Sequence, residues 1–156
     1  MKYEVFTNPL KNKTAMRKKL TLGLSLAFLM FIGVSNLQAQ ELRSPNGSSS
    51  GKIDSDGTIR NSSGSSCGKI DSDGTIRNGS GSSIGKIDSD GTIRNGSGSS
   101  IGKVDSDGTV RNTSGSSVGK VDSDGTVRNS SGSSIGSAKG ISKEKAAVCF
   151  FFFQFK

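Results

Sequence analysis

Apolar and polar positions follow a fixed 17-residue period through most of the chain. The unit GKIDSDGTIRNSSGSSC recurs with few changes in five copies, over residues 51–67, 68–84, 85–101, 102–118 and 119–135. Each unit holds three apolar side chains, which are Ile53, Ile59 and Cys67 in the first copy, among glycine, serine and charged residues. Such a period predicts a repeat architecture in which the units combine their apolar faces into one core.

Two turn signals occur in every unit. Asp54-Ser55-Asp56-Gly57 and Asn61-Ser62-Ser63-Gly64 both begin with Asp or Asn and end with Gly. This pattern is typical of a type I turn followed by a left-handed glycine, a common three-residue hairpin connection. The turns predict the pairing of the strands: Ile53 faces Ile59 across the first turn, and Ile59 faces Cys67 across the second.

Cys67 and Ile70 are three residues apart, so a regular strand would send them to opposite faces, and we expect a bulge or bend at Gly68 to bring both inward.

Closure of the array follows from its composition. An open ribbon would leave the apolar row exposed to water and two strand edges unpaired. We therefore predict an all-β fold over residues 40–145, in which tandem β-hairpin repeats close into a pseudo-five-fold ring. The alternative, a disordered Ser/Gly linker, does not explain the regular aliphatic positions.

The end of the chain differs from the repeats. Residues 146–156 read AAVCFFFFQFK and contain all five phenylalanines that follow the predicted leader. We interpret this segment as a Phe-rich C-terminal strand packed on or in the ring, where it adds bulk that the Ile and Val rows lack. Contact of this strand with a partner or a membrane surface is the alternative.

A leader precedes the repeats. From Met16 the chain has a basic start, an apolar run from Leu20 to Val34 and a short polar end, which is the layout of a secretory signal peptide over residues 16–39. We predict cleavage between Ala39 and Gln40 and release into the periplasm or the extracellular space, with no transmembrane span in the mature chain. An uncleaved signal anchor is the alternative. Residues 1–15 are interpreted as an upstream extension, since Met16 alone begins a complete leader.

The distribution of charge removes a first impression of a basic binding protein. The net charge is +8, of which residues 1–39 carry +5, with six Lys or Arg against one Glu. Each repeat is neutral, with one Lys, one Arg and two Asp, and no repeat contains an aromatic side chain on which a base could stack. The pattern argues against a nucleic-acid partner.

Three features together resemble a known family. They are the GKIDSDGTIRN units, the leader ending in LQAQ and the closing AAVCFFFFQF. In these the mature chain resembles the five-fold beta-flower proteins of secreted bacterial repeat families. The resemblance implies petals built from β-hairpins around a central axis, and it implies no activity, cofactor or site residue. The chain departs from the pattern at Cys67, where other copies have Ile or Val.

The two cysteines, Cys67 and Cys149, are candidates for one disulfide. An exported protein can form such a bond, and the predicted fold brings the tail toward the inner row. Two buried free thiols acting as small hydrophobic side chains are the alternative.

The repeat aspartates are weak candidates for calcium ligands. An EF-hand loop that placed Asp54 and Asp56 at its third and fifth positions would have Lys52 at the first and Ser63 at the twelfth, so both ends of the ligand set are missing. Turn formation is the competing explanation. The ten residues form pairs: Asp54 and Asp56, Asp71 and Asp73, Asp88 and Asp90, Asp105 and Asp107, Asp122 and Asp124.

Catalytic residue types are scarce. The chain has no histidine, and the mature chain has only Glu41 and Glu144 as glutamates, near its ends. We predict no cofactor and no enzymatic activity, and a secreted β-repeat protein with a structural or interaction role, toward an envelope protein or a surface glycan. The alternative is a ligand-binding module for calcium or acidic glycan at symmetric turn-rim sites.

Overall fold

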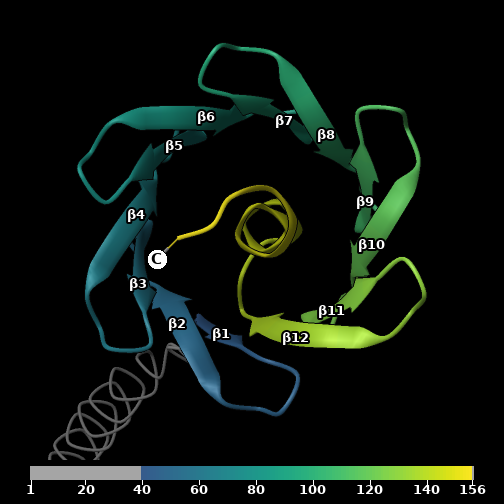
Figure 1. The fold of residues 1–156 in the computed structure, drawn as a ribbon, viewed down its shortest axis with the longest axis horizontal. Coiled ribbons are helices and arrows are strands. Elements are labelled where there is room, and N and C mark those ends of the chain that lie inside the picture. Colours follow the sequence, from purple (N-terminus) through teal and green to yellow (C-terminus); the bar gives the residue numbers. More distant parts are fainter. Residues whose placement is uncertain (1–39, 156) are drawn as a thin grey trace, which may run out of the picture. The chain divides into compact units, whose positions relative to one another are not determined.

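Twelve antiparallel strands form one closed ring in the computed structural model, which describes residues 40–155 (Figure 1). The predictions for the leader and the upstream extension lie outside these residues. Pairing of β1 with β12, with Leu42 opposite Ala138, closes the ring. The strands are β1 (Glu41–Arg43), β2 (Ser49–Ile53), β3 (Thr58–Asn61), β4 (Ser66–Ile70), β5 (Thr75–Asn78), β6 (Ser83–Ile87), β7 (Thr92–Asn95), β8 (Ser100–Val104), β9 (Thr109–Asn112), β10 (Ser117–Val121), β11 (Thr126–Asn129) and β12 (Ser134–Lys139).

The predicted all-β ring of hairpin repeats is confirmed. The number of inner turns differs from the number of outward hairpins. Five Asp-Ser-Asp-Gly turns connect the hairpins, one for each full repeat. Six hairpins point outward as petals, because the half-unit that contains Ser44-Pro45-Asn46-Gly47 adds one at the start (Figure 1). The chain ends thus supply a sixth position, where the β1–β12 pair replaces a turn.

Both turns have the hydrogen bonds expected of their sequences. At the first, the amide of Asp54 donates to the carbonyl of Thr58 at 2.8 Å, and the amide of Gly57 donates back to Asp54 at 2.9 Å. Gly57 has φ +89°, a left-handed conformation that a residue with a Cβ rarely adopts. The same bonds recur in every full repeat, so the local sequence determines each hairpin.

One predicted pairing is confirmed and one is wrong. Ile53 lies opposite Ile59, as expected across the first turn. Across the second turn Ile59 lies opposite Gly68, and not opposite Cys67, because the register shifts between Ile59 and Arg60. Cys67 is the extra residue of a β-bulge, which lets Cys67 and Gly68 both face inward. The expected bulge is therefore present, but its extra residue is Cys67, one residue before the predicted Gly68.

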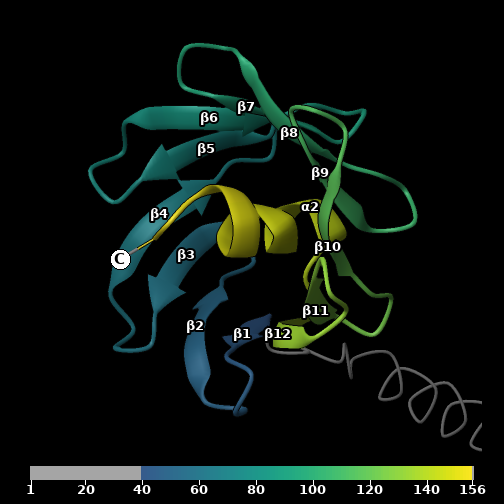
Figure 2. The same ribbon diagram turned by 45° about the vertical axis from the view of Figure 1, so that its right-hand side comes forward.

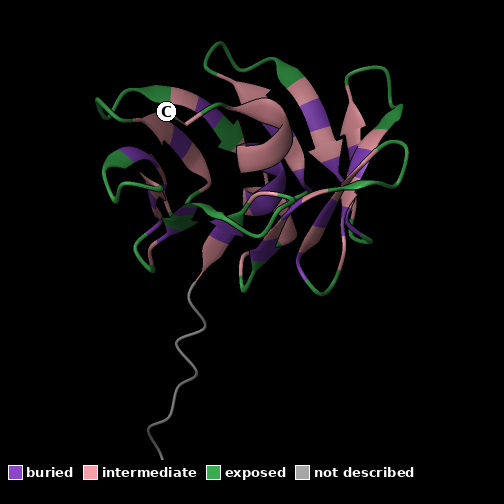
Figure 3. Cartoon of the chain, turned by 60° about the horizontal axis from the view of Figure 1, so that its bottom comes forward, coloured by how far each residue is buried: buried purple, intermediate pink, exposed green. Residues whose placement is uncertain are grey.

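The inner face is the core of the ring. The aliphatic residues on either side of the Asp-Ser-Asp-Gly turns are almost all buried, with Ile59, Ile76 and Ile93 at most 2% exposed. The bulge positions are less buried: Cys67 is 7% exposed, and its counterparts in the other repeats are partly buried. Figure 3 shows the same division, with buried residues along the ring and exposed residues at the hairpin tips.

The tail packs inside the ring, as predicted, but the prediction that it is a strand is wrong. It forms α2 (Lys143–Ala147) and the π-helical η1 (Val148–Phe152), followed by an extended end (Figure 2). Ser142 caps α2, since its hydroxyl accepts a hydrogen bond from the amide of Lys145. A lone strand inside a closed sheet would find no free edge for its backbone, whereas a helix satisfies its own N–H and C=O groups.

Each phenylalanine of the tail contacts a different strand at a glycine. We call the glycines that begin the 17-residue units, together with Gly136, the inner glycines. A Cβ built on five of them would collide with one phenyl ring each, and at Gly85 it would lie 2.6 Å from Phe153. The pairs are Gly136 with Phe150, Gly119 with Phe151, Gly102 with Phe152, Gly85 with Phe153, and Gly68 with Phe155.

The π-helix suits this arrangement. Six positions around the ring are about 60° apart, whereas consecutive residues of an α-helix are roughly 100° apart. The wider π-helix turns the chain by less at each residue. Four successive phenylalanines, Phe150 to Phe153, can thus reach four neighbouring hairpins.

Replacing an inner glycine should destabilise the ring. In Gly85→Ala the new methyl group would meet both the Arg94 carbonyl and the Phe153 ring, so we expect a loss of about 1–3 kcal/mol in the free energy of unfolding. Urea denaturation measures this loss. The control is Gly96→Ser, at a tip position with no contact under 3.4 Å, where other repeats have Ser or Thr. Equal stability of the two variants would contradict the packing described.

Candidate functional site

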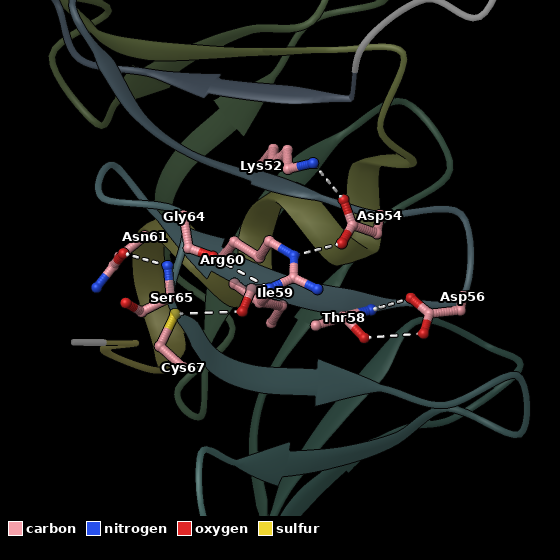
Figure 4. A network of polar contacts seen from close by, with 10 residues as sticks. All are labelled: Lys52, Asp54, Asp56, Thr58, Ile59, Arg60, Asn61, Gly64, Ser65 and Cys67. Carbon is pink, nitrogen blue, oxygen red and sulfur yellow. Dashed lines mark hydrogen bonds and ion pairs between the residues drawn. The ribbon is translucent and has the colours of Figure 1, made fainter.

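The outer face of the first repeat holds a cluster of three charged side chains. Lys52 lies opposite Arg60 on β2 and β3, and Asp54 lies between them (Figure 4). The Lys52 Nζ is 2.8 Å from Asp54 Oδ1, and the Arg60 Nε is 2.6 Å from Asp54 Oδ2. Hydrogen bonds from Lys52 and then from Arg60 lower the pKa of Asp54. One carboxylate thus neutralises two cations that would otherwise repel across the strand pair.

The Arg–Asp pair recurs in all five repeats, while the lysine varies. The five Arg–Asp distances are 2.6–2.7 Å. Lys103 and Lys120 contact the aspartates Asp90 and Asp107 of the preceding repeat, at 3.5 and 3.7 Å. Because these lysines are about half exposed, such pairs contribute under ~1 kcal/mol each. They favour the register between repeats without fixing it.

The second aspartate of each turn binds the start of the next strand. Asp56 accepts a hydrogen bond from the amide of Thr58 at 2.9 Å and another from its hydroxyl at 3.0 Å. The pKa of Asp56 is lowered mainly by the backbone bond from Thr58. The same two bonds lower the pKa of Asp73, Asp90, Asp107 and Asp124.

The hairpin tips use the remaining polar side chains. Asn61 Oδ1 accepts from the amides of Ser63 and Ser65 at 3.1 and 3.0 Å. Arg60 Nη1 donates to the carbonyl of Gly64 at 3.1 Å, which links the charged cluster to the tip. Aspartate, asparagine and arginine in each repeat are therefore bonded within the repeat itself.

This arrangement explains the aspartate pairs as turn residues. Both oxygens of Asp54 contact cationic side chains, and both oxygens of Asp56 contact Thr58. All four carboxylate oxygens thus already have partners within the repeat. Within residues 40–155, no group of three or more His, Cys, Asp or Glu side chains could hold a metal ion. The weak calcium candidates thus gain no support from the geometry.

A hollow of about 380 Å³ opens on the rim that carries the Asp-Ser-Asp-Gly turns. Two of these turns, after β4 and after β6, form its wall together with Ser142, Glu144 and Lys145 of the tail. Nearby, Lys143 Nζ donates to the carbonyl of Ser106 at 2.8 Å and so attaches α2 to this rim. In the part of the chain that the structure describes, no helix is long and apolar enough to span a membrane.

The two cysteines line one cavity, as the predicted position of the tail required. Both are free thiols in the structure, and Cys67 Sγ donates to the carbonyl of Ile59 at 3.4 Å. Burial, with a smaller contribution from Cys67, raises the pKa of Cys149 to about 12. Burial also raises the pKa of Cys67. The disulfide and the two free thiols stay the two alternatives, and the number of reactive thiols per chain distinguishes them.

Sequence reasoning missed the pairing of inner glycines with tail phenylalanines. The signal was present, because one glycine recurs at the same place in every repeat and five phenylalanines follow at the end. The sequence alone assigns this glycine only a bulge or bend of the strand. Its missing side chain in fact makes room for an aromatic ring.

The fold and its repeats define the class of the protein: a closed all-β repeat ring filled by its own C-terminal helix. The family model described as 5-fold beta-flower protein matches residues 39–154, and the chain belongs to this family. Comparison with curated proteins and with solved structures gives no significant match.

Acid should destabilise the ring. The pKa of Asp54, and that of Asp56 and its counterparts Asp73, Asp90, Asp107 and Asp124, is lowered in the folded state, so these carboxylates bind protons more weakly there than in the unfolded chain. Their contribution is complete above the unfolded pKa of 3.8 and is lost as the pH falls through the lower folded values.

We therefore expect the free energy of unfolding to be constant from about pH 7 to 5 and to fall below about pH 4. Urea denaturation across this range measures it. The control repeats the measurement at high salt. The loss of stability in acid should persist there, because hydrogen bonds from Thr58 and its counterparts are screened less than surface charges. A rise in stability on acidification would contradict the assignment.

Thiol titration tests the state of the cysteines. A thiol with a pKa near 12 is almost entirely protonated at neutral pH, so Cys149 should react with a disulfide reagent far more slowly than a free thiol in solution. After unfolding without reductant we expect two reactive thiols per chain. A count of zero would establish the disulfide instead.

Proposed function

We propose that this protein is secreted and non-enzymatic and has a structural or interaction role, with the hairpin tips as its contact surface. One observation carries the proposal. The aspartate, arginine and asparagine side chains of each full repeat are bonded within that repeat, whereas the residues of each hairpin tip are exposed. The exposed runs are 45–50, 62–66, 79–83, 96–100, 113–117 and 130–134.

The arrangement of the tips suits repeated weak contacts. The closed ring holds six similar Ser- and Gly-rich tips at its periphery, each anchored by its turn bonds (Figure 1). Tethered contacts of this kind raise the overall affinity beyond that of any one contact. Serine hydroxyls and exposed backbone groups can hydrogen-bond to an envelope protein or to a surface glycan.

Secretion is part of the proposal and rests on the leader over residues 16–39. The protein acts outside the inner membrane if this leader is removed between Ala39 and Gln40. N-terminal sequencing of the protein recovered from the periplasm or the medium determines where the mature chain begins.

The tip surface is tested by graded substitution. Ser→Lys is introduced at Ser65 and its counterparts Ser82, Ser99, Ser116 and Ser133, in one, three or five repeats, and binding to isolated cell envelopes is measured by sedimentation. These side chains are exposed, and only the backbone amides and carbonyls of these serines bond the tip asparagines. We expect affinity to fall more steeply than in proportion to the number of altered tips.

The matched control places the same charges on the opposite turns. It introduces Ser→Lys at the exposed Ser55, Ser72, Ser89, Ser106 and Ser123. Little loss of binding is expected there. Equal binding by all tip variants would contradict the proposal, and selective loss in the control set would favour ligand binding at the turn rim instead.

A further inference from the structure

One of the six inner glycines has no aromatic partner. Gly51 on β2 lies between Gly136 on β12 and Gly68 on β4 in the circular strand order. Phe150 covers Gly136 and Phe155 covers Gly68, but the nearest atoms to a Cβ at Gly51 belong only to the backbone of β3. Five phenylalanines thus fill five of six equivalent positions.

A cavity of about 140 Å³ marks the unfilled position. Phe150 and Phe155, the partners of the two neighbouring glycines, both line it. The remaining wall comes from β1 to β4 and from the tail: Leu42, Ser50, Ile59, Arg60, Asn61, Cys67 and Cys149. Ser50 precedes Gly51, and Arg60 and Asn61 supply the backbone atoms nearest to it, so the cavity lies next to Gly51.

Cys149 is the tail residue that corresponds to this sector. The residues from Phe153 back to Phe150 contact successive inner glycines around the ring, and the last of these is Gly136. The residue before Phe150 is Cys149. The inner glycine after Gly136 in the circular strand order is Gly51. A thiol is much smaller than a phenyl group. The short side chain accounts for the space beside Gly51.

We propose that this cavity binds a small, neutral, single-ring aromatic molecule. A dry apolar cavity of roughly 150 Å³ is known to accept benzene, so the volume is suitable. The wall supplies two phenyl rings, from Phe150 and Phe155, and aliphatic side chains against which a ring can pack, and its polar part comes from Ser50, Arg60 and Asn61. The centroids of Phe153 and Phe155 are 6.4 Å apart, within the range at which aromatic rings attract each other.

The exposed end of the tail offers a route to the cavity. Gln154 is exposed, and Phe155, which lines the cavity, is only partly buried. A ligand can enter by displacement of these last residues, without opening the closed sheet.

Toluene is the probe, and the full mature protein is the sample. We expect toluene at about ten times its dissociation constant to raise Tm by about 5 °C. Cys149→Phe should fill the sector, raise Tm without ligand and weaken toluene binding at least tenfold. Cys149→Ala, which keeps the space, should retain binding and serves as the matched control. Cyclohexane, which is thicker than a flat ring, should bind at least tenfold more weakly than toluene.

Several outcomes would overturn the proposal. These are no Tm shift with toluene, the same shift in Cys149→Phe and Cys149→Ala, and equal binding of cyclohexane. The first indicates a cavity filled by water alone. If Cys149→Phe does not fold, Cys67→Ile replaces it, because Ile84 and Ile101 show that the ring accepts isoleucine there. Unchanged toluene binding in that variant would equally overturn the proposal.

Discussion

Closure of the sheet is the constraint on which the rest of the structure depends. Because β1 pairs with β12, every strand edge is occupied and no backbone group of the sheet is left for another segment. The inner face carries only small aliphatic side chains and glycines, which cannot fill the centre of a ring of twelve strands. The centre must therefore be filled by a segment that needs no strand partner, and a helix meets this requirement.

The inner glycines and the tail phenylalanines depend on each other. Glycine within a strand weakens it, since the residue loses more backbone entropy and offers no side chain to pack. At five of the six inner glycines the absent side chain makes room for a phenyl ring. Full burial of such a ring contributes about 1.5–3 kcal/mol, and these partly buried rings contribute a share of it. The repeats thus carry a local cost that only the last residues of the chain offset. Ring and tail form one cooperative unit in which neither is complete alone.

On the outer face, the residues that form the turns differ from the residues that are exposed for contact. Asp54, Arg60 and Asn61 form bonds within their own repeat, and Asp56 bonds the next strand through Thr58. These bonds fix the two turns, so the hairpin keeps its shape without help from its neighbours. In the described residues, the exposed side chains of Ser65, Ser82, Ser99, Ser116 and Ser133 form no such bond, since only the backbone of these serines contacts the tip asparagines. A contact surface at the tips can therefore vary while the ring stays the same.

Local patterns made most of the ring predictable, and long-range packing explains the failures. The Asp-Ser-Asp-Gly turn gave the pairing of Ile53 with Ile59, because four adjacent residues determine it. The pairing of Ile59 with Cys67 failed because a bulge shifts the register, so that Gly68 lies opposite Ile59 and faces a phenyl ring from a distant segment of the chain. The Phe-rich segment is predicted to be a strand that adds bulk to the ring, and it is a helix because the closed sheet has no free edge with which a strand could pair.

The departures of the chain from its own regularity meet in one sector. Cys67 replaces the Ile or Val of the other repeats, and Cys149 stands where the series of tail phenylalanines would continue. These two positions are far apart in sequence, yet both line the cavity beside Gly51. The same sector contains the closing strands, where half-units replace a full repeat. A cysteine is smaller than the Ile or Val expected at position 67 and than the Phe expected at position 149. Because both positions hold cysteine, the two gaps merge into a cavity about the size of an aromatic ring.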